Sequence, residues 1–249
     1  MKKRQTINLF FFTAFIVATT SLIYVFGTMN FSSSSKKPWH LQPSLDEDSL
    51  SRDYLNKYPI MNQKPLFKQA FDSSRTNLYI LVDAWGVPLQ EETLRNEFFI
   101  FKNIPHKYAI HRRLANRTKH AELAEFRGDI DNKAYLFGGD STEYNRSSIA
   151  RELGFKKIFF YQNTLDSELL VKIDSLLKTD SLKWITWTTQ SSRGGNKDSL
   201  YKSLKLIAEF ARLHPSIHIV IQGTHRPVLC GPEIRNSYKA HWVPVAILN

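Results

Sequence analysis

A chain of 249 residues that is 42% hydrophobic and 13% aromatic has enough apolar side chains for a packed core, which excludes global disorder. The formal net charge of +11 indicates acidic partners, such as anionic lipid or a phosphorylated or sulfated substrate. Nucleic acid is the least favoured partner, because the basic residues are scattered and no zinc-finger or RNA-binding signature is present. Cys230 is the only cysteine, so the chain can form neither an intramolecular disulfide nor a thiolate metal cluster.

The N-terminus predicts a membrane anchor. Basic residues at positions 2–4 precede an uncharged apolar stretch over residues 8–27, which as a helix would span ~30 Å, the thickness of a bilayer's hydrocarbon core. The alternative is a cleaved signal peptide, which has a shorter apolar region and a small-x-small cleavage site that residues 27–30 match poorly. We predict a single-pass anchor in the cell membrane, with residues 1–7 cytoplasmic and the C-terminal domain extracytoplasmic.

Residues 28–76 resemble a stalk rather than a folded element. Four consecutive serines occupy positions 32–35, and residues 45–58 are polar with weak helical periodicity. We therefore expect a linker over residues 28–76 and a folded domain over residues 77–249.

Strand-like and helix-like windows alternate after residue 77. Such alternation predicts an α/β fold, with a largely parallel central sheet and helices on both of its faces. The strand-like windows are 78–82, 133–137, 157–161, 183–188, 216–221 and 243–248, and the helix-like windows are 89–95, 144–153, 167–177 and 198–213.

Asp83 follows the first of these strands directly. Five apolar residues run into it, and the chain then turns through Gly86 and Pro88. Ligands of open α/β sheets bind beyond the carboxyl ends of the strands, so a metal ligand or catalytic carboxylate is expected at this position. The alternative is that Asp83 only caps the turn.

A basic segment over residues 112–122 contains one hydroxyl, that of Thr118. A threonine becomes a nucleophile when a base removes its proton or a metal lowers its pKa. Arg113, Arg117 and Lys119 could hold an anionic group beside it. The alternative is a solvated basic loop.

His225 follows another buried-type strand, within the sequence Gly-Thr-His at residues 223–225, and His241 is a further candidate ligand. A lone histidine after a strand can be purely structural. One carboxylate, one hydroxyl and one or two imidazoles at strand ends would nevertheless suit a divalent transition metal such as Zn or Mn.

The order of these segments resembles the alkaline phosphatase superfamily, in its sulfatase-like branch of sulfatases, lipoteichoic acid synthases and phosphoethanolamine transferases. Four segments carry the resemblance, which covers roughly residues 77–249. They are the strand ending in an acid at 81–88, the threonine segment at 116–122, the Gly-Gly-Asp to Gly-Phe segment at 137–155, and the Gly-x-His at 223–225 with Val-Pro at 243–244.

Two departures from the family pattern concern the site. Thr224 stands where the family's Gly-Asp-His has a second metal-binding aspartate, and Ser192 stands where a Ser-His pair is expected. A neutral hydroxyl attracts a divalent cation less than a carboxylate does. Either Asp140 or His241 substitutes for the aspartate, or the metal site is degraded and the metal is absent.

The resemblance implies a membrane-anchored hydrolase or transferase that acts on phosphate or sulfate esters of an envelope lipid or glycan. Asp83, Thr118, His225 and His241 would be the ligands of a divalent Zn, Mn or Mg ion, with Thr118 as the nucleophile.

Arg113, Arg117 and Lys119 would bind the substrate's anionic oxygens. The rival interpretation is a catalytically inactive binding or scaffold domain that has lost part of its metal site. A weaker one is a basic ectodomain that grips anionic glycans.

Overall fold

The computed structural model describes residues 49–62, 65–113, 117–127, 149–161, 166–178, 181–189 and 196–249, which fall within one compact unit over residues 44–249. The predicted anchor lies outside these ranges, as do the predicted strand at 133–137, the first half of the predicted helix at 144–153 and residues 190–192. Among the helices of the described ranges, none is long and apolar enough to cross a membrane.

The described residues form a seven-stranded sheet with the order β1-β3-β7-β6-β2-β5-β4. The predicted largely parallel sheet is confirmed, because only β7 runs antiparallel to its neighbours, β3 and β6. The strands are β1 (Ile60–Met61), β2 (Asn77–Val82), β3 (His106–Arg112), β4 (Lys157–Tyr161), β5 (Lys183–Thr188), β6 (His218–Gly223) and β7 (Trp242–Leu248).

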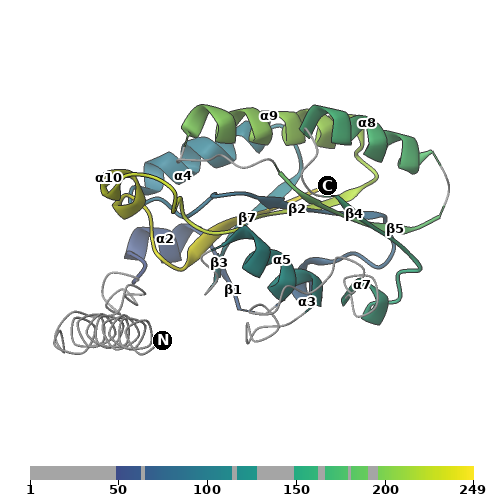
Figure 1. Cartoon of the computed structure of the whole chain (residues 1–249), viewed down its shortest axis with the longest axis horizontal. Helices are drawn as coiled ribbons and strands as arrows, with labels where there is room; N and C mark the ends of the chain where they lie inside the picture. The colour runs from purple at the N-terminus through teal and green to yellow at the C-terminus, as the bar shows by residue number, and fades with distance from the viewer. Residues whose placement is uncertain are drawn as a thin grey trace, which may run out of the picture. The chain divides into compact units, whose positions relative to one another are not determined.

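Helices cover both faces of this sheet, as predicted (Figure 1). One face carries α4 (Glu91–Phe98), α8 (Asp166–Leu177) and α9 (Lys197–Leu213), and the other carries α3 (Phe67–Ala70), α5 (Thr118–Arg127) and α7 (Ile149–Glu152). The remaining elements are α2 (Arg52–Lys57), the 3-10 turn η1 (Phe99–Phe101) and α10 (Pro232–Asn236).

Strand β2 lies in the middle of the sheet and supplies both cores. All six of its residues are buried. Ile80 and its even-numbered neighbours point into the cluster that contains the α9 side chains, whereas Tyr79 and Leu81 point into the cluster under α3 and α5. Because successive side chains of a strand point to opposite faces, an uninterrupted apolar run is what a strand buried on both faces requires.

Part of the segment that we assigned to a linker is packed into the domain. Residues 52–70 contain α2, β1 and α3, and Tyr54, Leu66 and Phe67 are buried in the two cores. The sequence pattern also does not predict strand β3. Residues 52–70 and β3 both place few apolar residues among many polar ones, so neither segment shows a clear apolar period of 2 or 3.6 residues.

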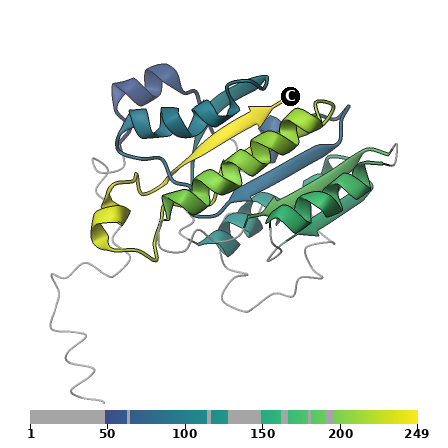
Figure 2. The same cartoon turned by 90° about the horizontal axis from the view of Figure 1, so that it is seen from above.

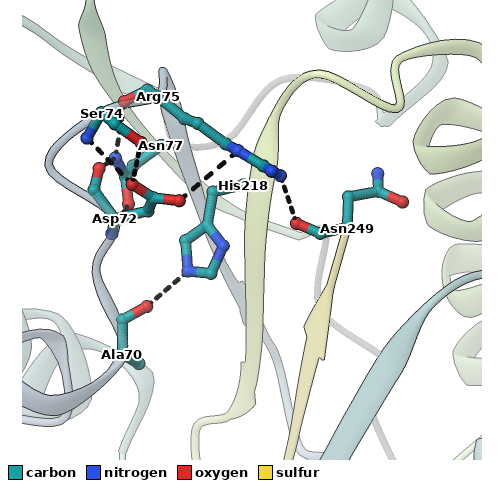
Figure 3. Close-up of polar contacts among 7 residues, drawn as sticks. All are labelled: Ala70, Asp72, Ser74, Arg75, Asn77, His218 and Asn249. Atoms are coloured by element: carbon teal, nitrogen blue, oxygen red, sulfur yellow. Dashed lines mark hydrogen bonds and ion pairs between the residues drawn. The ribbon is translucent and has the colours of Figure 1, made fainter.

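A polar network holds the sheet edge at which β2 and β6 begin (Figure 3). Asp72 Oδ1 accepts from the backbone N–H of Ser74 at 2.9 Å, and Arg75 Nη1 donates to the backbone oxygen of Asn249 at 2.7 Å. His218 Nε2 lies 2.5 Å from the carbonyl oxygen of Ala70. The polar groups at this edge therefore hold the first residues of the strands in place. The candidate catalytic residues lie at the opposite edge of the sheet.

Candidate active site

The structure brings together Asp83, Thr118 and His225, which are far apart in the sequence. Strands β2 and β6 are parallel neighbours with Val82 opposite Gly223, so the residues that follow them meet at one sheet edge. The Thr118 hydroxyl, on the first residue of α5, donates to Asp83 Oδ1 and lies 3.2 Å from His225 Nε2. His225 Nε2 is 3.7 Å from Asp83 Oδ1.

Close backbone packing fixes the two loops that carry Asp83 and His225. A Cβ atom at Gly223 would lie 1.8 Å from the carbonyl oxygen of Trp85, and one at Gly86 would lie 2.7 Å from the Cα of Arg226. Glycine is therefore required at both positions for the loops to approach this closely. Ala84, which follows Asp83 in the loop after β2, has a φ of 55°, in the left-handed region that a non-glycine residue rarely adopts.

Threonine hydroxyls hold the backbone at this strained turn. Thr189 Oγ1 accepts from the backbone N–H of Asp83 at 3.1 Å, and Thr224 Oγ1 accepts from that of Ala84 at 3.0 Å. Thr224 Oγ1 also lies 3.5 Å from Asp83 Oδ1. Thr224, at the position where the resemblance would place a second aspartate, thus supports the loop and contributes no negative charge.

His225 presents an unprotonated nitrogen to the site. Its Nδ1 lies 2.6 Å from the carbonyl oxygen of Arg226, which can only accept, so Nδ1 carries the proton in the neutral ring. Burial lowers the pKa of His225, although the nearby Asp83 carboxylate opposes this effect. The lone pair of Nε2 is therefore available on the side of Thr118 and Asp83. The single hydroxyl proton of Thr118 has two nearby acceptors, Asp83 Oδ1 and His225 Nε2.

This set of donors is of the kind that binds a divalent cation, but its spacing fits one only in part. Tetrahedral Zn²⁺ with bonds of about 2.1 Å places its ligand atoms about 3.4 Å apart. The two contacts of His225 Nε2, at 3.2 and 3.7 Å, are close to that value, whereas the direct hydrogen bond from Thr118 to Asp83 holds those two oxygens closer together. Three protein ligands with an open fourth position are typical of catalytic zinc sites.

The ligand set has one carboxylate only. Within the described ranges, no three His, Cys, Asp or Glu side chains gather into a group that could hold a metal. His241, the fourth predicted ligand, therefore does not complete such a group with Asp83 and His225. Its backbone oxygen instead accepts from the backbone N–H of Arg113 at 2.6 Å.

Arg113 is the buried member of the three predicted anion-binding residues. It is 3% exposed, and its Nη2 donates to Glu125 Oε1 at 2.6 Å. Its Nε and Nη1 have no hydrogen-bond partner in the part of the chain that the structure describes. Its charge also contributes to the lowered pKa of His225, which places it near the site. Arg117 and Lys119 flank Thr118 and are exposed.

Glu122 is a site residue that the sequence reasoning did not select. It follows Thr118 by one helical turn, is 5% exposed, and accepts from Thr188 Oγ1 at 2.6 Å. Burial raises the pKa of Glu122 to about 7, and the Asp83 carboxylate adds to the shift. The i, i+4 spacing from Thr118 could have identified it, but only if α5 had been predicted as a helix.

Fold and site together define an α/β domain with a carboxylate, a hydroxyl and an imidazole at the carboxyl edge of its sheet.

No family model and no curated protein matches the sequence. Solved structures are similar to it, among them an alkaline phosphatase superfamily protein from Vibrio parahaemolyticus, with 11% identity, a TM-score of 0.49, and coverage of 70% of this chain and 60% of that one.

Two further solved structures are similar at the same level. The phosphoglycerol transferase GacH from Streptococcus pyogenes has 14% identity and a TM-score of 0.44, over 72% of this chain and 70% of that one. The lipoteichoic acid synthase LtaP from Listeria monocytogenes has 11% identity and a TM-score of 0.46, over 69% and 65%. The chain thus spans less than two thirds of the Vibrio and Listeria proteins.

Proposed function

We propose that this chain is a membrane-anchored hydrolase or transferase that acts on phosphate esters, or less favourably sulfate esters, of the cell envelope. One observation carries the proposal: the Thr118 hydroxyl donates to the Asp83 carboxylate and lies 3.2 Å from the lone pair of His225 Nε2. A hydroxyl between two proton acceptors at a sheet's carboxyl edge is a nucleophile with its base in place.

Thr118 Oγ1 would attack the phosphorus while its proton passes to His225 Nε2 or Asp83. The phosphorus–oxygen bond to the leaving alcohol breaks, the alcohol takes up a proton, and the phosphoryl group remains on Thr118. Water or a second alcohol then attacks this ester and restores the threonine. Attack by water gives hydrolysis, and attack by an alcohol gives transfer. A divalent cation at Asp83, Thr118 and His225, when bound, would lower the pKa of the hydroxyl and offset the charge of the phosphoryl oxygens.

Cationic side chains around Thr118 support an anionic substrate. Arg113 is buried beside Glu125, and its Nε and Nη1 have no partner within the described residues, so its charge and these two donors could serve an anion that reaches them. Arg117 and Lys119 are exposed on either side of Thr118, where they could attract the substrate. The predicted anchor at residues 8–27 favours an envelope lipid or glycan as the molecule that carries the ester.

The test is an assay of the full chain in detergent with bis(p-nitrophenyl) phosphate and p-nitrophenyl sulfate, with Zn²⁺, Mn²⁺ or Mg²⁺ added. We expect turnover of the phosphodiester that falls at least ~100-fold in Thr118→Ala and recovers partly in Thr118→Ser. One bound metal ion per chain, lost in Asp83→Ala, is expected from elemental analysis. Turnover that is unchanged in Thr118→Ala would contradict the proposal.

A second candidate is a binding or scaffold domain that has lost catalysis. The observation that favours it is the neutral Thr224 beside Asp83, together with the lack, among the described residues, of three His, Cys, Asp or Glu side chains grouped so that they could hold a metal. A folded domain that binds no metal and turns over neither ester would favour this candidate. It should then still bind an anionic glycan or lipid headgroup, and Thr118→Ala should leave that binding unchanged.

A further inference from the structure

Four exposed apolar side chains belong to segments at one end of the described domain. Leu229 is 77% exposed, Ile234 on α10 is 41% exposed, Leu89 is 48% exposed and Leu55 on α2 is 49% exposed. We call these four side chains the α10 face. Figures 1 and 2 both show α2 and α10 at the same end of this part of the chain. Singly exposed leucines are ordinary on a protein surface, but a group of them marks an interaction surface.

Hydrogen bonds join the segments that contribute to the α10 face. The Tyr54 hydroxyl donates to the carbonyl oxygen of Pro88 at 2.6 Å, which ties α2 to the segment before Leu89. The backbone N–H of Leu89 donates to the carbonyl oxygen of Ser237, the residue that ends α10, at 2.8 Å. The segments that carry the four apolar side chains are therefore held together by hydrogen bonds.

The described chain begins beside this surface. Lys239 Nζ, two residues beyond the end of α10, donates to the carbonyl oxygen of Ser49 at 2.6 Å. Only 21 residues separate Ser49 from the apolar run at residues 8–27. A chain of that length spans at most ~70 Å when fully extended. A bilayer that holds the apolar run is thus within reach of the α10 face.

We propose that the α10 face rests on the surface of a lipid bilayer, with its leucines and isoleucine at the boundary between headgroups and acyl chains. Ile234 lies between Glu233 and Arg235 in α10, so this short helix carries one side chain of each charge, and the docking that we propose depends on apolar contact. Leu229 follows His225 by four residues, so docking would bring the rim of the candidate active site to the headgroups. This consequence for the substrate rests on the proposed function, and the docking rests on its predicted membrane anchor but not on its catalysis.

The chain's single cysteine, Cys230, adjoins Leu229 and allows a direct test. The full chain, labelled at Cys230 with an environment-sensitive fluorophore, is reconstituted into vesicles of phosphatidylethanolamine and phosphatidylglycerol. We expect a blue-shifted emission relative to detergent and at least twofold quenching by nitroxide-labelled lipid. The double variant Leu229→Glu with Ile234→Glu should lose most of that quenching, because buried carboxylates are costly at the acyl boundary.

Leu213→Glu is the matched control, because Leu213 is equally exposed, at 77%, but ends α9 at the opposite edge of the sheet. It should retain the quenching of the wild type. Quenching that is absent, or equal in the double variant and the wild type, would overturn the proposal. So would self-association in detergent that the double variant abolishes without any lipid quenching, since a second copy would then cover the face. Thr118→Ala should dock normally, which separates this result from any failure of catalysis.

Discussion

Gly223 lies against the carbonyl group of Trp85 so closely that a Cβ atom there would be 1.8 Å from the carbonyl oxygen. This contact joins the loop that follows β6 to the loop that follows β2, and so sets the distance between His225 and Asp83. We predict that Gly223→Ala destabilises the domain by about 3 kcal/mol, because backbone atoms cannot give way as a flexible side chain would. Urea unfolding would measure the loss.

Gly231→Ala is the control for this variant, since a Cβ atom at Gly231 would meet nothing within 4 Å. It should change the unfolding free energy by less than about 0.5 kcal/mol. Equal stabilities for the two alanine variants would show that the two loops do not pack as described.

Glu97 should make the domain less stable as the pH rises towards neutrality. It is fully buried, Trp85 Nε1 donates to its Oε2 at 2.8 Å, and burial raises its pKa to about 7. The folded state therefore keeps this proton up to about pH 7, whereas the unfolded chain loses it near pH 4.5. Because the folded state binds more protons in that window, stability falls as the pH rises through it, on the order of 3 kcal/mol in total from this group.

The check is urea unfolding at pH 5 and pH 7.5. Glu97→Gln keeps an oxygen for the Trp85 N–H but cannot ionise, so it should lose this part of the pH dependence. Glu92→Gln, an exposed position on the same helix, should keep the slope of the wild type. Identical slopes in the Glu97→Gln variant and the wild type would contradict the prediction.

Arg113 should bind the phosphate of the substrate, and Arg113→Lys should weaken that binding. Lysine can keep the charge beside Glu125 but cannot present the two N–H groups that are free of partners among the described residues. We expect the affinity for inorganic phosphate, measured by calorimetry, to fall about tenfold. The exposed Arg117→Lys should change it less than twofold. An equal loss in both variants would mean that Arg113 acts only as the partner of Glu125.

The hydrogen bond from Thr188 to Glu122 should position the helix that begins with Thr118. Thr188→Val removes the donor, so we expect kcat to fall about tenfold with KM nearly unchanged, and the unfolding free energy to fall by about 1–2 kcal/mol. Thr186→Val is the matched control on the same strand, since its hydroxyl donates to the carbonyl oxygen of Phe159, remote from the site. It should lose similar stability and keep kcat. A Thr188→Val variant with normal kcat would contradict a positioning role.

The strands that could be predicted are those with runs of apolar and β-branched residues. β2 and β5 have every residue buried, and such runs are visible without knowledge of their neighbours. β3 could not be predicted, because its polar residues are accommodated by contacts distant in sequence. One of these is the 2.8 Å contact between His111 Nδ1 and Gln222 Nε2.

The same difference applies to the candidate site. Asp83 and His225 could be proposed from the rule that chemistry lies beyond the carboxyl ends of parallel strands. Glu122 and the burial of Arg113 could not, because they depend on the position of α5. That helix has a weak apolar pattern, and Glu125, which holds Arg113, becomes its neighbour only once the helix packs on the sheet.

The most direct test of the proposed nucleophile is mass spectrometry of the chain after rapid acid quenching during turnover of bis(p-nitrophenyl) phosphate. The account predicts a phosphoryl ester on Thr118 in the wild type, and its absence in Thr118→Ala. An unmodified Thr118, or an ester on any other residue, would contradict it.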